Sequence, residues 1–249
     1  FSHNFNRSGM LDAGWTLTGS AVHSMSLDFI EFWKKGLDTD IIPTALPIEP
    51  EKNCFPILFT RSEAYPNFTK TPQTSSSNWA FLHLVDAAKV SIDIFTPSLN
   101  NNTFISHLLD AVRRGVKVRV ILSHSYESFK QSLPTRGGDN SFKVAAIYRE
   151  LNTLKNPCES LHIKWFSENG LAPTRGARPP ASHTKYMSVD GQVTYFGSQN
   201  MDNQSWVNSR EIALFIDSRN KTQVWNEQIF QPYFQTSIEV AQCRSSYPF

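Results

Sequence analysis

The sequence predicts an α/β fold in which a mixed β-sheet is flanked by helices on both faces, and three observations support this class. An amphipathic segment, Asn102–Gly115, lies between two segments rich in β-branched residues, Val90–Thr96 and Val116–Ser123. A helix between two strands is a βαβ unit, whose strands pair in parallel. Alternating segments on either side of Asp190-Gly191 indicate an antiparallel hairpin. With 249 residues, 40% of them hydrophobic, the chain can bury a sizeable core.

The N-terminal third predicts a short strand, a helix and a connector. The stretch GWTLTGSAVHSMSLDFIEFWKKG, residues 14–36, predicts the strand and then the helix, whose spacing is carried by Val22, Met25, Phe29, Phe32 and Trp33. Residues 40–78 contain six prolines and end in TPQTSSSN, which is typical of a connector, with one short strand at Pro56–Thr60. A second helix follows, with Asn78 as its N-cap and with Trp79, Leu82, Val85 and Ala88 on one face.

The remaining elements follow from the same patterns. Gly115 is a typical C′ residue that ends the helix Asn102–Gly115. A polar loop at 124–140 precedes a helix at Ser141–Lys155 and a third strand at Leu161–Ser167. After the hairpin, which spans residues 184–197, the sequence predicts a strand at Arg210–Asp217 and a C-terminal helix from Lys221 to about Phe234.

Composition narrows the possible functions. The formal net charge of +2 gives no large basic field, which argues against a dedicated duplex-DNA binder. No apolar run approaches the roughly 20 residues that span a bilayer. The spacing of Cys54, Cys158 and Cys243 matches no zinc pattern, and one disulfide is possible. Glycosylation sequons weakly favour secretion or an endomembrane lumen; they occur at Asn6, Asn67, Asn101, Asn203 and Asn220.

The strongest chemical signal is the stretch SHTKYMSVDGQVTYFGSQN, residues 182–200. His183 and Lys185 are two residues apart, so a strand would project both side chains to one face. An imidazole beside an ammonium suits a phosphoryl centre, because the Lys neutralises phosphate oxygens while the His attacks phosphorus. Gly197 would let the backbone approach closely, and Ser198 and Asn200 would donate hydrogen bonds to the same oxygens.

Two further acidic residues belong to this pattern. Glu211 lies on the next predicted strand and could orient a His ring nitrogen. Asp190 is a candidate catalytic residue, but Asp-Gly also fixes a hairpin turn by itself. A lone His-x-Lys on a strand is ordinarily a pair of solvent-exposed residues with no catalytic role. The conjunction with Asp190, Gly-Ser-x-Asn and Glu211 is what indicates a site.

These residues resemble the HKD motif, His-x-Lys-x4-Asp followed by Gly-Ser-x-Asn, of the phospholipase D superfamily. The run GSQNMDNQSWVNSREIALFID is similar to the cardiolipin-synthase-like branch. The resemblance covers roughly residues 79–235. It implies an α/β sandwich and phosphodiester chemistry without a metal or another cofactor. It also implies two HKD motifs that face each other, one His forming a phosphohistidine and the other protonating the leaving alcohol.

The chain contains one full motif, and its first residues suggest where the other belongs. FSHNFNRSG resembles GSQNMDNQS, with Ser2 matching Ser198 and Asn4 matching Asn200 as phosphate-binding candidates. We therefore expect three parts: 1–36 as the tail of a first repeat, 37–78 as a connector, and 79–249 as the second repeat. Phe1 stands where Gly is expected, and no Glu near Trp15 matches Glu211. The first motif would come from an N-terminal half that is separate or missing; otherwise two copies of His183 would meet in a homodimer.

The expected substrate is a phospholipid, with a peripheral membrane surface as the expected partner. A nuclease acting on single-stranded nucleic acid would use the same chemistry, and a non-catalytic relative is a third alternative. Each remaining candidate residue also has a structural interpretation. His162 is interpreted as an edge or hydrogen-bonded residue rather than a catalytic one, and His124, after a strand end, could line the pocket. Trp206 would belong to the core or border the lipid entry. Pro173–Arg178 reads as a solvated loop or a headgroup contact, and Leu37–Ile48 as a core cover or a membrane loop.

Overall fold

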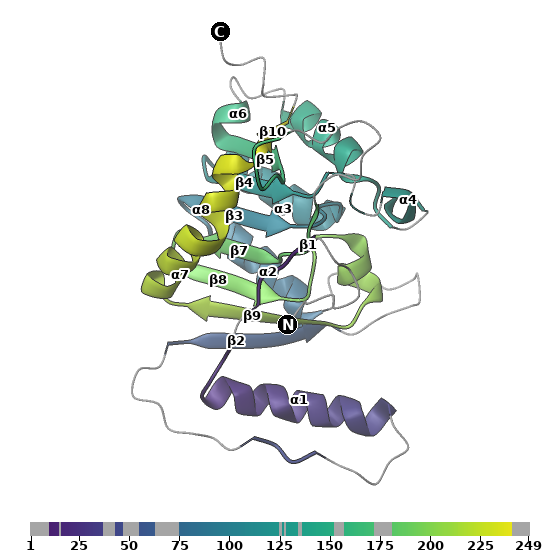
Figure 1. The fold of residues 1–249 in the computed structure, drawn as a ribbon, viewed down its shortest axis with the longest axis vertical. Helices are drawn as coiled ribbons and strands as arrows, with labels where there is room; N and C mark the ends of the chain where they lie inside the picture. The colour runs from purple at the N-terminus through teal and green to yellow at the C-terminus, as the bar shows by residue number, and fades with distance from the viewer. Residues whose placement is uncertain are drawn as a thin grey trace.

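The predicted α/β class is confirmed by a computed structural model, which describes residues 10–14, 16–36, 43–46, 55–62, 75–124, 126, 128–133, 136–151, 157–171 and 181–240. Eight strands form one mixed sheet in the order β10-β5-β4-β3-β7-β8-β9-β2 (Figure 1). Their bounds are β2 (Ile57–Ser62), β3 (Ser91–Thr96), β4 (Lys117–Leu122), β5 (Leu161–Trp165), β7 (Tyr186–Val189), β8 (Val193–Gly197), β9 (Glu211–Asp217) and β10 (Ile238–Glu239). A separate two-stranded ladder joins β1 (Met10–Leu11) to β6 (Ala181–Ser182).

Strand directions agree with the sequence patterns. Strands β3, β4 and β5 pair in parallel, as the βαβ pattern predicts. Strands β7 and β8 form the predicted antiparallel hairpin, and β9 continues it. Strand β2 lies at the sheet edge, antiparallel to β9, so part of the predicted connector belongs to the sheet.

Helices cover both faces of the sheet. One face carries α2 (Ser76–Ala87), α3 (Asn102–Arg113) and α5 (Asn140–Glu150), and the other carries α7 (Arg219–Trp225), η4 (Asn226–Phe230) and α8 (Gln231–Thr236). Helix α1 (Ser20–Gly36) lies beside β2 at one end of the molecule (Figure 1). The short elements are α4 (Ser128–Gln131), α6 (Pro157–Ser160) and η3 (Gln204–Asn208).

Helix α2 departs from its prediction at its first turn. It starts at Ser76 with Ser75 in the N-cap position, so the prediction that Asn78 caps it is wrong. Of the residues predicted to share one face, Leu82, Val85 and Ala88 are buried, but Trp79 is 48% exposed and Phe81 is fully buried instead. Asn78 faces the interior, where its Nδ2 donates to the Trp206 carbonyl at 3.0 Å. Asn is a favoured N-cap residue, and a short window of sequence does not show that this one is buried.

The N-terminal segment keeps the predicted helix but not the predicted strand position. Helix α1 contains all five residues that showed helical spacing. The strand found before it is β1, upstream of residues 16–18, which are irregular. Cys158, on α6, is disulfide-bonded. The other two cysteines, Cys54 and Cys243, lie outside the described residues.

Candidate active site

The segment that carries His183 is held by the β1–β6 ladder. Leu11 pairs with Ser182 in parallel, and the His183 backbone N–H donates to the Leu11 carbonyl at 2.6 Å. Ser123, at the end of β4, exchanges hydrogen bonds of 2.9 Å with the Ser182 backbone. His183 therefore lies at the carboxyl-terminal ends of the parallel strands, where sites in α/β proteins commonly form.

The imidazole of His183 contacts a carboxylate that the sequence interpretation missed. His183 Nδ1 lies 3.0 Å from Asp12 Oδ2, and the two side chains are 13% and 10% exposed. An ionised carboxylate only accepts hydrogen bonds, so Nδ1 carries the proton and Nε2 carries the lone pair of the neutral ring. Asp12 lies three residues before Trp15, where a Glu was sought. The sequence did contain one signal for Asp12: it is an acidic residue in the N-terminal segment that resembles residues 198–211.

Lys185 lies beside His183 but not in the predicted strand. Residues 183–185 are irregular, and β7 begins at Tyr186. The Lys185 side chain is 3% exposed, and its Nζ donates to the His183 carbonyl at 2.7 Å. Burial lowers the pKa of Lys185 from 10.5 to about 8, although the negative charges of Asp12, Glu211 and Asp202 oppose that change. A buried ammonium next to His183 is a strong electrostatic partner for an incoming anion.

We expect the pKa of Lys185 to be measurable by NMR titration of protein labelled with ε-¹⁵N lysine. One lysine resonance, assigned by its loss in Lys185→Gln, should titrate near pH 8, below the ordinary lysine value of about 10.4. Inorganic phosphate should move the Lys185 midpoint upward, because an anion stabilises the ammonium. A Lys185 midpoint near 10.4 without phosphate would contradict the buried position.

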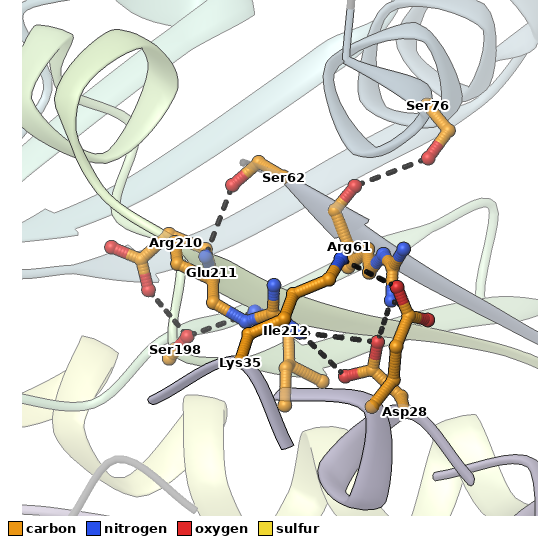
Figure 2. Close-up of polar contacts among 10 residues, drawn as sticks. Asp28, Lys35, Arg61, Ser62, Ser76, Ser198, Arg210, Glu211 and Ile212 are labelled. Atoms are coloured by element: carbon orange, nitrogen blue, oxygen red, sulfur yellow. Dashed lines mark hydrogen bonds and ion pairs between the residues drawn. The ribbon is translucent and has the colours of Figure 1, made fainter. Parts of the chain in front are cut away.

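Glu211 contacts Ser198 rather than His183. The Ser198 hydroxyl donates to the Glu211 carboxylate and accepts from the Ile212 N–H at 3.1 Å (Figure 2). Burial raises the pKa of Glu211 from 4.5 to about 7, and the hydroxyls of Ser198 and Ser205 oppose that rise. Glu211 contacts no histidine within the described part of the chain. Asp12, and not Glu211, contacts His183, so the role of Glu211 in orienting a His ring stays a prediction for a histidine outside the described residues.

Helix α2 holds the Gly-Ser-x-Asn loop in place through hydrogen bonds to Gln199. Gln199, the variable position, is fully buried; its Nε2 donates to Asn78 Oδ1 at 2.7 Å, and its Oε1 accepts from Ser77. Asn200 Nδ2 donates to Asp202 at 3.2 Å. Asn200 Oδ1 is buried, and no hydrogen-bond partner for it lies among the described residues. The roles of Ser198 and Asn200 as phosphate donors stay predictions, since their donors point to carboxylates here.

Gly197 has a structural reason different from the predicted one. A Cβ at this position would lie 2.1 Å from the Ile212 carbonyl and 3.0 Å from the Tyr195 ring. The close approach is thus between β8 and β9, and it explains the glycine without invoking a ligand.

Asp190 lies at the other end of the hairpin from His183. Asp190 and Gly191 have φ values of 54° and 59°, the positive pair that a type I′ turn requires. The Asp190 carboxylate accepts from the N–H groups of Val90 at 2.8 Å and Ser91 at 2.9 Å. Burial opposes ionisation, but these backbone donors lower the pKa of Asp190. We assign Asp190 the turn-holding role, which ties the hairpin to the start of β3.

The remaining candidates divide between packing residues and residues outside the described ranges. The His124 ring meets the Trp165 ring edge to face at 4.9 Å, and His162 Nδ1 lies 3.8 Å from Glu239. Trp206 is 2% exposed and packs against Phe81, so it belongs to the core. Ser2, Asn4 and the Pro173–Arg178 loop lie outside the described residues. Of Leu37–Ile48, residues 43–46 are described.

The described residues contain neither a metal-binding cluster nor a membrane-spanning helix. No group of three or more His, Cys, Asp or Glu side chains there could hold a metal ion. Within the same ranges, no helix has the length and apolar character required to cross a bilayer.

Comparison with known sequences places the chain in a family. The family model described as "Cardiolipin synthase, PLD-like domain" matches residues 81–233, more than half of the chain. Cardiolipin synthase C from Escherichia coli (strain K12) is 25% identical over 140 residues, which are 55% of this chain and 28% of that protein. The chain thus spans less than a third of that relative's length.

Solved structures share the fold. The phospholipase D family member Nuc from Salmonella typhimurium superposes with a TM-score of 0.52 at 18% identity, covering 74% of this chain and 97% of that chain. Phosphatidylserine synthase from Haemophilus influenzae Rd KW20 gives a TM-score of 0.55 at 14% identity, covering 80% of this chain and 42% of that chain. At these low identities, the two superpositions show that the fold is shared.

Proposed function

Because this chain belongs to the phospholipase D (PLD)-like family of cardiolipin synthases, we propose that it supplies one half of an active site that hydrolyses or transfers a phospholipid headgroup phosphodiester. The observation that carries the proposal is the Asp12–His183 contact beside the buried Lys185. It combines an oriented imidazole with an ammonium, the two groups that displacement at phosphorus requires.

The proposed reaction uses two imidazoles. The Nε2 lone pair of one attacks phosphorus, and an N–P bond forms as the bond to the leaving oxygen breaks. The second imidazole gives its proton to that oxygen. It then takes a proton from water, or from an acceptor alcohol, whose oxygen attacks phosphorus and breaks the N–P bond. His183 supplies one of the two rings, and Asp12 stabilises the tautomer needed in either role. No metal or other cofactor takes part in these steps.

The position of Glu211 supports a second imidazole from outside the described residues. Asp12 follows the segment that resembles Gly-Ser-x-Asn, and it reaches the His183 of the other segment. If a two-fold axis relates the two motifs, Glu211 would contact the His of the first motif as Asp12 contacts His183. Its buried carboxylate, with a pKa of about 7, has serine partners but no histidine partner within the described ranges. We propose that the first motif comes from an N-terminal half, or otherwise from a second copy of this chain.

A membrane-facing surface is proposed at the same end of the sheet. Phe129 on α4 is 83% exposed and Phe142 on α5 is 78% exposed. Ser128 donates to Asp139, which joins the starts of these two helices. The Tyr126 ring, just before α4, lies 6.4 Å from the His183 ring. Two exposed aromatic rings beside the site suit insertion among lipid headgroups.

The double substitution Phe129→Ser with Phe142→Ser should weaken binding to phosphatidylglycerol vesicles about tenfold or more, because two apolar rings no longer leave water. Cosedimentation measures the binding. Val90→Ser, at a residue that is 65% exposed at the other end of β3, is the matched control. Hydrolysis of a soluble diester should be unchanged in both. Equal vesicle binding by the double variant and the control would refute the surface.

The compartment is also a proposal. The disulfide of Cys158 suits an oxidising compartment, such as the secretory lumen or the cell exterior.

The function is tested with the natural protein that carries this sequence. It should cleave bis(p-nitrophenyl) phosphate in the presence of EDTA, and samples with phosphatidylglycerol that are quenched by denaturant at mildly alkaline pH should contain a histidine with a phosphatidyl mass increment. Release of the headgroup distinguishes a lipid substrate, and parallel incubation with single-stranded DNA reports nuclease activity. Activity of this chain alone that rises with the square of its concentration would indicate a second copy as the partner. No turnover of any phosphodiester would overturn the proposal.

A further inference from the structure

A large apolar cavity lies between α1 and the sheet. Its volume is about 470 Å³, within the range of roughly 300–1,000 Å³ of small-molecule sites. Val22, Met25 and Phe29 form the α1 side. Phe196 of β8 and Leu214 of β9, which are paired neighbours, form part of the sheet side. Most of the other lining residues are also apolar, and none is charged.

Two chain segments that carry candidate active-site residues also line the cavity. Gly197 lines the cavity and is followed directly by Ser198, whose hydroxyl contacts Glu211. Thr16 also lines it, four residues after Asp12, the partner of His183. A ligand whose phosphate lies at His183 could therefore extend along these two segments into the cavity.

Partly buried ion pairs hold α1 over the cavity. Asp28 of α1 is 8% exposed and accepts hydrogen bonds from Arg61 of β2 and, at 3.2 Å, from Arg210 (Figure 2). Arg210 directly precedes Glu211, and its guanidinium lies 4.5 Å from the centre of the Phe32 ring. The helix above the cavity is thus tied to the strand that carries Glu211. This makes the cavity a preformed space, because any movement of α1 away from the sheet would separate Asp28 from both guanidinium groups.

The chemistry of the lining selects the occupant. Nucleotides need cations and hydrogen-bond donors, and bases stack on exposed rings, whereas this cavity offers aliphatic and aromatic carbon. A methylene chain gains about 0.8 kcal/mol per buried CH₂, or about fourfold in affinity. We propose that the cavity binds one acyl chain of a lipid phosphodiester whose phosphate lies at His183 and Lys185. The inference rests on the proposed function and adds the position of the chain.

Binding is tested first, because it does not require turnover. Dodecyl phosphate, below its micelle concentration, should bind the natural protein at least tenfold more tightly than hexyl phosphate in calorimetry. Val22→Trp fills the cavity from α1 and should remove that difference. Val224→Trp, at a residue on α7 that is 38% exposed and outside the cavity lining, is the matched control and should keep it. Melting temperatures show whether each variant is folded; if Val22→Trp does not fold, Leu214→Phe replaces it.

Turnover separates this inference from the proposed function. The kcat/KM for phosphatidylglycerols should rise with chain length in the natural protein and not in Val22→Trp, while bis(p-nitrophenyl) phosphate is cleaved equally by both. Equal binding of the two alkyl phosphates, or unchanged chain-length dependence in Val22→Trp, would overturn the acyl site and leave the phosphodiesterase standing. Dissociation of a dimer by Val22→Trp would instead show that a second copy fills the cavity, and would also overturn it. Selective binding without any turnover would uphold the cavity and reject the proposed function.

Discussion

Replacement of His183 by asparagine is expected to lower kcat for bis(p-nitrophenyl) phosphate by about 10⁴-fold or more. Asparagine keeps a hydrogen-bond donor near Asp12 but has no basic nitrogen to attack phosphorus or to carry a proton. The loss should appear in kcat rather than in KM, because Lys185 still provides its charge to the phosphate.

Steady-state kinetics on the natural protein, with its single substitution confirmed by mass, measures this effect. His162→Asn is the matched control, since that ring lies on β5 beside Glu239 and not beside Lys185. It should retain nearly full activity. A His183→Asn variant that keeps more than a tenth of the natural kcat would remove His183 from the proposed mechanism.

Replacement of Asp12 by asparagine is expected to lower kcat by roughly 10²–10⁴-fold with little change in KM. The amide is nearly isosteric but neutral, so it no longer fixes the proton on Nδ1 or stabilises a protonated His183 ring. The ring can then adopt the tautomer in which Nε2 carries the proton.

An Asp–His pair elsewhere in the chain provides the control. Asp86 Oδ1 lies 2.7 Å from His107 Nδ1 in an exposed pair, so Asp86→Asn tests the loss of such a contact away from the site. In a double-mutant cycle, Asp12→Asn should add almost nothing to His183→Asn, because the carboxylate acts through the ring. Additive losses would mean that Asp12 acts independently of His183.

The sheet could be predicted because its signals are local. The βαβ segment around Asn102–Gly115 and the Asp190-Gly191 turn each combine periodicity with a specific residue at the boundary. Gly115 has a φ of +89° and Asp190 a φ of 54°, as those positions require. The error at Asn78 has a different origin. Its burial depends on Gln199 and Trp206, more than a hundred residues away, and no short window contains that information.

The site could be predicted in its residue types but not in its contacts. The His-x-Lys spacing located the two central groups, although both lie outside a strand. The contact between Asp12 and His183 could not be predicted, because it depends on pairing between segments that are far apart in the sequence. Asp12 and His183 are 171 residues apart, and β1 and β6, which bring them together, contain two residues each. Such short strands have no periodicity to recognise.

The shortness of β1 has a consequence for how activity would be lost on heating. Each strand in this ladder is two residues long and separate from the eight-stranded sheet, so opening it costs much less free energy than unfolding the core. Asp12 would then leave His183 while the central strands remain paired. Thermal inactivation and global melting are thus separate events, and the lifetime of the catalytic pair is set by the weakest ladder rather than by the core.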